Sequence, residues 1–311
     1  MGARGMKRHA DPVDGLLLLN KPPGMSSNQA LQRVRRLINA RKAGHTGSLD
    51  PAATGMLPLC FGEATKVCGY LLNADKSYRV TARLGSATDT GDADGTVIES
   101  ADLPNLNADD WDALLQGFLG ESEQVPPMYS ALKKDGKRLY ELARKGEEVE
   151  RAPRPIRIDT IELLEAAGTR LVFRVSCSKG TYIRVLVEDI ARRAGTVAHT
   201  QRLHRESVGA FASDGMVDMA TVEALAEAGP EPLRDKLLPA EVALAEMPEV
   251  SVSSDDADRF SGGQAVAALN EGPQGLARVY EAGSRFLGVG ELDENGRVAP
   301  RRVFLTQEKS S

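Results

Sequence analysis

The spacing of apolar residues changes several times along this chain, and each change marks a predicted element. Residues 15–20 form an apolar run suited to one buried strand, which ends at a Lys-Pro-Pro-Gly turn at 21–24. A helix is predicted from about Ser27, because apolar residues then recur at helical spacing. From Tyr78 the period becomes two, which predicts a half-buried antiparallel strand with these residues on its inner face: Tyr78, Val80, Ala82 and Leu84.

Both patterns return later in the chain. Residues 62–72 and 109–118 have helical spacing, and a strand with alternating apolar residues over 171–177 leads into a helix. The apolar stripe of that helix consists of Ile183, Leu186, Val187, Ile190 and Ala194. Residues 214–249 form an acidic, helical connection that contains prolines. From about residue 250 the pattern is all-β, with a hairpin turn at 294–296, and this predicts a small barrel.

The composition indicates a globular protein without a membrane span. Hydrophobic residues make up 41% of the 311 positions and charged residues 27%, and no apolar run approaches the ~20 residues that a membrane helix needs. The three cysteines form an odd count without C-x-x-C spacing, which argues against a disulfide framework and against structural zinc. They fit a reducing compartment, so we expect a cytoplasmic protein.

The net charge of −5 conceals a segregated distribution. Residues 1–42 hold nine Lys and Arg against two acids, and residues 133–157 hold nine against five. Residues 214–260, in contrast, hold twelve acids and three bases. Because a polyanion responds to the field within about one Debye length, ~8–10 Å, separate basic segments permit an RNA-binding face. Solvated helix faces would explain the same charges equally well.

The most informative segment is residues 44–51, with the sequence GHTGSLDP. Asp50 follows His45, one of four histidines, by five residues and stands in a run that is otherwise small or apolar. A simple alternative is a helix start, with Asp50 as the cap and Pro51 in the first helical position. Asp-Pro pairs are common in such turns, so the longer sequence has to decide between the two interpretations.

Residues 43–59, AGHTGSLDPAATGMLPL, followed by GEATK at 62–66, resemble the catalytic motif of the TruB family of tRNA pseudouridine synthases. Further segments resemble motifs of this family in the family's order over residues 14 to about 210. They are GLLLLNKPPG at 15–24, KSYRV at 76–80, VPPMYSAL at 125–132, SKGTYIR at 178–184 and RLHR at 202–205. The resemblance implies isomerisation of uridine to pseudouridine at position 55 in the T loop of tRNA.

This reaction breaks the N1–C1′ bond, rotates the uracil and rejoins it through C5. No group is gained or lost, so the family chemistry implies no cofactor and no metal. It needs a carboxylate as nucleophile or base, a role the resemblance gives to Asp50. Burial would raise the pKa of Asp50, so a cation should accompany it. We expect Arg184, in the first turn of its helix, to bind it in bidentate geometry, although a solvated arginine is the simpler interpretation.

Further roles follow from the resemblance. Tyr78 would stack on the uracil and move a proton, with a core aromatic as the alternative, and His45, in a flexible 44–47 loop, would occupy the space left by the flipped base. Leu203 would pack under the uracil, Lys21 would shape the pocket, and Asp92 would orient catalytic groups. The basic insertion, residues 124–155, would contact RNA through Lys133, Lys134, Lys137 and Arg138.

The implied fold is α+β: a mixed, largely antiparallel sheet with flanking helices, followed by a small PUA-like β-barrel. We predict a flexible tail at 1–12, a catalytic domain at 13–245 and a PUA-like RNA-binding domain at 246–311. The expected partner is the T arm of tRNA, with no membrane and no obligate protein partner, and the protein is expected to be a monomer. Alternatives are an RNA-guided or other-RNA synthase, and a non-catalytic RNA-binding or RNA-folding module.

Overall fold

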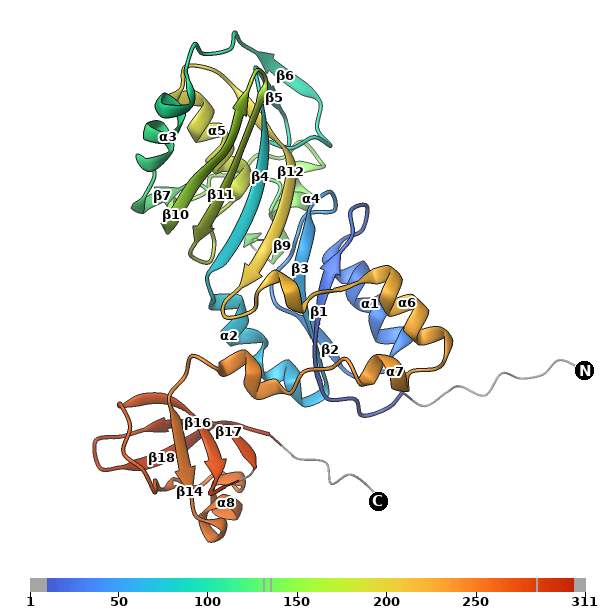
Figure 1. The fold of residues 1–311 in the computed structure, drawn as a ribbon, viewed down its shortest axis with the longest axis vertical. Helices are drawn as coiled ribbons and strands as arrows, with labels where there is room; N and C mark the ends of the chain where they lie inside the picture. Colours follow the sequence, from blue (N-terminus) through green and yellow to red (C-terminus); the bar gives the residue numbers. More distant parts are fainter. Residues whose placement is uncertain (1–9, 131, 135, 284, 305–311) are drawn as a thin grey trace, which may run out of the picture.

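A nine-stranded sheet forms the centre of the larger part of the molecule (Figure 1). The computed structural model describes residues 10–130, 132–134, 136–283 and 285–304. The strand order is β13-β1-β3-β12-β4-β11-β10-β7, with β2 paired to β3. The β1–β13 and β3–β12 pairs are parallel and the others are antiparallel. The prediction of a mixed, largely antiparallel sheet is therefore confirmed.

The strands of this sheet have the following bounds. They are β1 (Gly15–Lys21), β2 (Ala43–His45), β3 (Thr54–Phe61), β4 (Lys76–Leu84), β7 (Gly120–Gln124), β10 (Arg154–Ala167), β11 (Arg170–Cys177), β12 (Ala198–Val208) and β13 (Val217–Asp218). In β4 every second residue from Tyr78 to Leu84 is buried, as the alternation predicted. The same holds for β11, in which Leu171, Phe173, Val175 and Cys177 are buried.

Two of the helices begin at a capping box that the sequence supplies. Helix α1 (Ser27–Leu37) opens with a capping box between Ser26 and Gln29, and α3 (Ala108–Gln116) with one between Asn107 and Asp110. Figure 1 shows α3 and α5 (Ile183–Arg193) lying against the β4–β11–β10 part of the sheet. The predicted helix at 62–72 begins as a 3-10 turn, η1 (Gly62–Val67), and continues as α2 (Cys68–Asn73).

The remaining elements of this part are short. They are β5 (Ser86–Thr88), β6 (Val97–Ser100), β8 (Lys133–Lys134), β9 (Lys137–Arg138), α4 (Leu139–Ala143), η2 (Ser213–Gly215), α6 (Met219–Glu227), α7 (Glu231–Arg234) and η3 (Ala240–Leu244). Within the described ranges, no helix is long and apolar enough to cross a membrane. Most of the predicted tail lies outside the described residues, but Asp11 is held in place. Its N–H donates to the Asn39 carbonyl at 2.8 Å and its carboxylate pairs with Arg234, so at this point the prediction of a flexible tail is wrong.

A second sheet, of five strands in the order β14-β16-β17-β18-β15, forms the C-terminal part. Its strands are β14 (Glu249–Val252), β15 (Val266–Ala267), β16 (Gly275–Glu281), β17 (Phe286–Leu292) and β18 (Arg297–Val303). The β17–β18 hairpin turns at the predicted 294–296. The all-β prediction is wrong at α8 (Ser254–Ser261), whose Ala257 and Phe260 are buried in the core of this sheet.

The two parts share apolar contacts. A buried cluster joins Met56 and Cys60 of β3 with Val289 of β17 and Phe304 at the end of the described chain. The Lys66 ammonium donates to the Val303 carbonyl at 2.6 Å and lies 5.5 Å from the centre of the Phe304 ring. The C-terminal sheet is therefore anchored on the larger part, although it also has a core of its own. The domain boundaries at 12 and 245 remain predictions.

Candidate active site

Asp50 lies in the loop between β2 and β3, and both of its neighbours are fixed. Ser27, at the start of α1, accepts a hydrogen bond from Leu49 N–H at 2.7 Å and donates to the Leu49 carbonyl at 3.2 Å. On the other side, Gly24 N–H donates to the Pro51 carbonyl at 2.9 Å. Residues 51–53 are not helical, so the interpretation of Asp50 as a helix cap is wrong. The loop instead presents the carboxylate, whose side chain is 42% exposed.

Lys21 supports the same loop from β1. Its side chain is fully buried, and its ammonium donates to three carbonyl oxygens, those of Pro22 at 2.8 Å, Met25 at 2.9 Å and Pro51 at 3.2 Å. Burial lowers the pKa of Lys21 to about 8, although Asp50 opposes that shift. These three contacts of the ammonium support the loop, and the role of Lys21 in shaping a pocket remains a prediction.

Arg184 is the cation beside Asp50. The Arg184 Nε atom lies 3.0 Å from Asp50 Oδ2, and its side chain is only 7% exposed, so the interpretation of Arg184 as a solvated arginine is wrong. The expected bidentate geometry is also wrong. Nε is the nitrogen that lies on the carboxylate, whereas Nη1 donates to the Thr90 carbonyl at 2.8 Å and Nη2 to the Tyr129 carbonyl at 2.7 Å. The guanidinium thus joins the carboxylate to two separate loops.

Opposing influences act on the pKa of Asp50, and burial is the largest of them. Burial raises the pKa of Asp50, Arg184 lowers it, and Asp92 raises it again. Asp92 Oδ2 lies 3.7 Å from Arg184 Nη1, while its Oδ1 accepts a 2.6 Å hydrogen bond from the Thr90 hydroxyl. Asp92 therefore lies beside the arginine, and its orienting role remains a prediction.

Tyr78 lies on the sheet beside a buried arginine that the sequence analysis did not single out. Arg205 of β12 is the cross-strand partner of Tyr78 and is only 1% exposed. Its Nε donates to the Met56 carbonyl at 2.7 Å and its Nη2 to the Gly47 carbonyl at 3.3 Å. Burial raises the pKa of the Tyr78 hydroxyl, and the neighbouring Arg205 charge opposes this. Arg205 thus ties the Asp50 loop, β3 and Tyr78 together.

Gly55 explains how Arg205 comes so close to β3. A Cβ atom at Gly55 would lie 2.3 Å from the Arg205 carbonyl oxygen, and the Gly55 φ of +100° is one that side-chain-bearing residues rarely adopt. The glycine of the Ala-Thr-Gly segment at 53–55 is therefore required by the close parallel contact between β3 and β12.

His45 and Leu203 lie on regular strands. His45 ends β2 and pairs with Leu59, so the predicted flexible loop is wrong at this residue. Its Nδ1 is buried without a hydrogen-bond partner in the described part of the chain, and burial lowers its pKa. Leu203 of β12 is half-buried and pairs with Val80 of β4. The roles of both residues toward a flipped base remain predictions.

The insertion residues are placed only in part. Lys133, Lys134, Lys137 and Arg138 belong to the two-stranded β8–β9 hairpin, and Lys137 is exposed. Their contact with RNA remains a prediction.

Among the described residues, no group of three or more His, Cys, Asp or Glu side chains is arranged to hold a metal ion.

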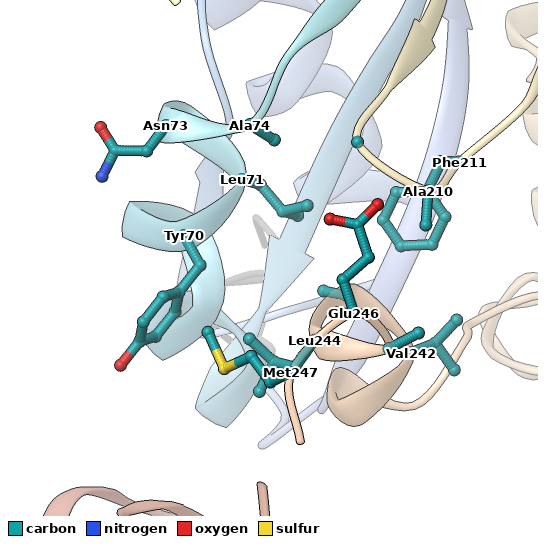
Figure 2. A pocket seen from close by; sticks show the side chains of 13 residues that line it. Tyr70, Leu71, Asn73, Ala74, Ala210, Phe211, Val242, Leu244, Glu246 and Met247 are labelled. Atoms are coloured by element: carbon teal, nitrogen blue, oxygen red, sulfur yellow. The ribbon is translucent and has the colours of Figure 1, made fainter. Parts of the chain in front are cut away.

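Two pockets lie outside this constellation. One of about 560 Å³ borders it at Thr90, Gly91 and Tyr129, the loops that receive Arg184. The other, of about 210 Å³, lies between α2, the 209–211 turn and η3 (Figure 2), and none of the predicted site residues lines it. Glu246 is the acid that points into this second, largely apolar pocket. The paired groups around Asp50 are therefore the better candidate for chemistry.

Known proteins resemble this chain over almost its whole length. Family models described as TruB family pseudouridylate synthase (N terminal domain), tRNA pseudouridylate synthase B C-terminal domain, and Pseudouridine synthase II TruB, C-terminal match residues 35–183, 184–245 and 248–304. The tRNA pseudouridine synthase B of Nitrosococcus oceani is 51% identical over 95% of this chain and 96% of its own length. That of Pseudomonas putida strain F1 is 49% identical over 97% and 99%.

Solved structures share the fold at lower identity. A chain from an H/ACA RNP bound to a substrate RNA containing 2'-deoxyuridine superposes with a TM-score of 0.72 and 23% identity, covering 94% of this chain and 85% of its own. A chain from a Cbf5-Nop10-Gar1 complex gives 0.71 and 24%, covering 98% and 87%. These likenesses show the fold, and the identities of about one half to the curated relatives show that this chain belongs to the TruB family of pseudouridine synthases.

Proposed function

We propose that this protein is an isomerase that converts uridine to pseudouridine in tRNA, at position 55 of the T loop. The observation that carries the proposal is the Asp50–Arg184 pair, in which a half-exposed carboxylate is held 3.0 Å from a buried guanidinium. Relatives named tRNA pseudouridine synthase B, about one half identical over nearly the whole chain, support the choice of tRNA as substrate.

In this reaction Asp50 acts on the target nucleoside as nucleophile or base. Arg184 keeps it ionised, because a neighbouring positive charge opposes the rise in pKa that burial causes. The N1–C1′ bond breaks, the uracil turns, C5 bonds to C1′, and the C5 proton leaves while N1 gains a proton. In this proposal Tyr78 contacts the uracil and moves that proton. Its position beside Arg205, with 8% of its surface exposed, supports this role.

The substrate has to be extruded to reach this site. A uridine in a folded loop is unstacked at a cost of a few kcal/mol, so we expect recognition of the RNA shape rather than of a long sequence. The Lys133–Arg138 hairpin supplies positive charge for this contact.

The reaction needs no cofactor and no guide RNA. The cytoplasm is the compartment that fits a tRNA substrate and the free thiols of Cys60, Cys68 and Cys177.

The decisive experiment uses the purified protein alone with an unmodified tRNA transcript. Pseudouridine should form at position 55, and a transcript with cytidine at that position should remain unmodified. The conversion should survive exhaustive EDTA treatment once the RNA is folded. An absence of pseudouridine would refute the proposal, and pseudouridine at another position would refute the choice of site. A requirement for added guide RNA or another protein would refute independent action.

A further inference from the structure

Gln124, the last residue of β7, is bound to the backbone at the start of the Arg184 helix. Its side chain is buried at 4% exposure. Its Oε1 accepts a hydrogen bond from Tyr182 N–H at 2.7 Å, and its Nε2 donates to the Tyr182 carbonyl at 3.1 Å. One amide group thus satisfies both polar atoms of a single peptide residue. A buried amide group is costly unless its oxygen and its nitrogen both have hydrogen-bond partners, and here both do.

Tyr182 is the N-cap residue of α5, directly before its first residue and two positions before Arg184. No side chain of α5 itself caps this end, since Tyr182 makes no side-chain cap hydrogen bond. The Tyr182 carbonyl also accepts the helical hydrogen bond from Leu186 N–H at 3.1 Å. Gln124 therefore takes the place of a cap, from a different strand, and fixes the position of the first helical turn.

Gln124 also lies at the base of the insertion, residues 124–155. Its backbone pairs with Arg154 across β7 and β10, so the chain leaves for the insertion and returns from it at this pair. Inside the insertion, the Tyr129 carbonyl accepts the 2.7 Å hydrogen bond from Arg184 Nη2. The base of the insertion thus holds Arg184 twice, once at the guanidinium and once through the backbone at the helix start.

We propose that Gln124 is a positioning residue for the isomerisation: it fixes the start of α5 so that the Arg184 Nε atom stays on Asp50, and it links this pair to the base of the insertion. The inference rests on the proposed function of the site. The Gln124 side chain hydrogen-bonds to Tyr182 and the Asp50 carboxylate pairs with Arg184, so Gln124 acts on Asp50 through Arg184. A role confined to stability would predict a lower melting temperature with unchanged chemistry at the site.

The test replaces Gln124 with methionine, which has similar length and volume but forms neither hydrogen bond. Single-turnover conversion at saturating enzyme should slow roughly tenfold to a hundredfold, the cost of a displacement of about 1 Å in a catalytic group. Affinity for tRNA should change less than about threefold. The control is Gln116→Met in α3, an exposed glutamine whose side chain also donates to a distant backbone carbonyl, that of Ile161 at 3.0 Å. Its rate should remain that of the wild type.

A pH profile separates positioning from stability. Asp50 is faced by Arg184 from α5, by Asp92 and Asp94 from the 89–95 loop, and by Lys21 from β1. Arg184 is the main influence that lowers the Asp50 pKa. If Arg184 withdraws, this pKa rises, so the acid limb of the single-turnover rate in Gln124→Met should move to higher pH by about half a unit or more. A protein that is merely less stable, assayed where it is folded, keeps the wild-type limb.

A second variant covers the case in which Gln124→Met does not fold. Gln124→Glu keeps the acceptor for Tyr182 N–H but replaces the donor with a carboxylate oxygen that faces the Tyr182 carbonyl, so it should slow the reaction threefold or more without weaker RNA binding. A wild-type single-turnover rate in a folded Gln124 variant would overturn the proposal. So would a slower rate with an unmoved acid limb in Gln124→Met, or a loss of activity that weaker tRNA binding accounts for. The proposed function itself fails differently, because the wild-type protein would then form no pseudouridine.

Discussion

Replacing Arg184 with lysine tests the central ion pair most directly. Arg184 contacts Asp50 at 3.0 Å, the Thr90 carbonyl at 2.8 Å and the Tyr129 carbonyl at 2.7 Å, each with a different nitrogen. Lysine keeps the charge, but a single ammonium cannot span three partners placed around a planar fork. Hydrogen bonds from a charged group contribute about 1.5–3 kcal/mol each, so losing two of them removes about 3–6 kcal/mol.

If the transition state feels about half of that loss, the rate falls roughly tenfold to a hundredfold. The assay is single-turnover pseudouridine formation at saturating enzyme, with thermal unfolding recorded for each variant. Arg192→Lys, on the same helix with its side chain 71% exposed, is the matched control. Arg193 is less suitable, because it donates to the Gly117 carbonyl at 3.0 Å. Rates within twofold of each other for two folded variants would refute the assigned role of Arg184.

Four further outcomes are expected. Asp50→Asn should abolish turnover and leave tRNA affinity within a few fold, because the amide keeps the shape without the reactivity. Turnover and affinity are measured on the same preparation, and substantial residual turnover would contradict this. Burial raises the Asp50 pKa, so the wild-type rate should fall with decreasing pH at a midpoint above the ~3.9 of an unperturbed aspartate, and a midpoint at or below that value would count against it. Alanine in the β8–β9 hairpin should flatten the salt dependence of binding by ~0.7–0.9 in log–log slope for each phosphate that the protein no longer binds, whereas unchanged slopes in all variants would remove the hairpin from the RNA face; the residues to change are Lys133, Lys134, Lys137 and Arg138. Truncation near Glu249 should lower the melting temperature, since Val289 and Phe304 leave the shared cluster, and weaken tRNA binding while chemistry persists at saturating enzyme; a folded fragment without chemistry would show that the division into domains is wrong.

The sequence predicted those features that depend on local pattern or on an extended motif. The alternation in β4 placed Tyr78 on the buried face, and the GHTGSLDP and SKGTYIR segments identified the partners of an ion pair that lie 134 positions apart. The expected bidentate geometry was wrong because the contacts of the Arg184 guanidinium do not follow from residue types. They depend on where the Thr90 and Tyr129 carbonyls lie, and these long-range contacts leave no periodic trace in the chain.

Arg205 and α8 were missed for different physical reasons. Register shifts in β12, between Thr200 and Arg202 and between Arg205 and Ser207, interrupt the alternation that would have marked Arg205 as inward-facing. In α8 only Ala257 and Phe260 are buried, and the polar, aspartate-rich remainder resembles a connection between strands. Its start is set by Ser253, whose hydroxyl accepts from Asp256 N–H at 3.2 Å, a signal too brief to outweigh the surrounding strand pattern.

The three carbonyl oxygens around Lys21 form the kind of cage in which proteins hold a monovalent metal ion, with an ammonium in its place. This ion is covalently tethered, so it cannot exchange with the medium. Salt screens the exposed charges that attract a polyanion, but it reaches a fully buried ammonium much less. We therefore expect ionic strength to change the binding of RNA by exposed basic residues and to leave the contacts of Lys21 with the Asp50 loop unchanged.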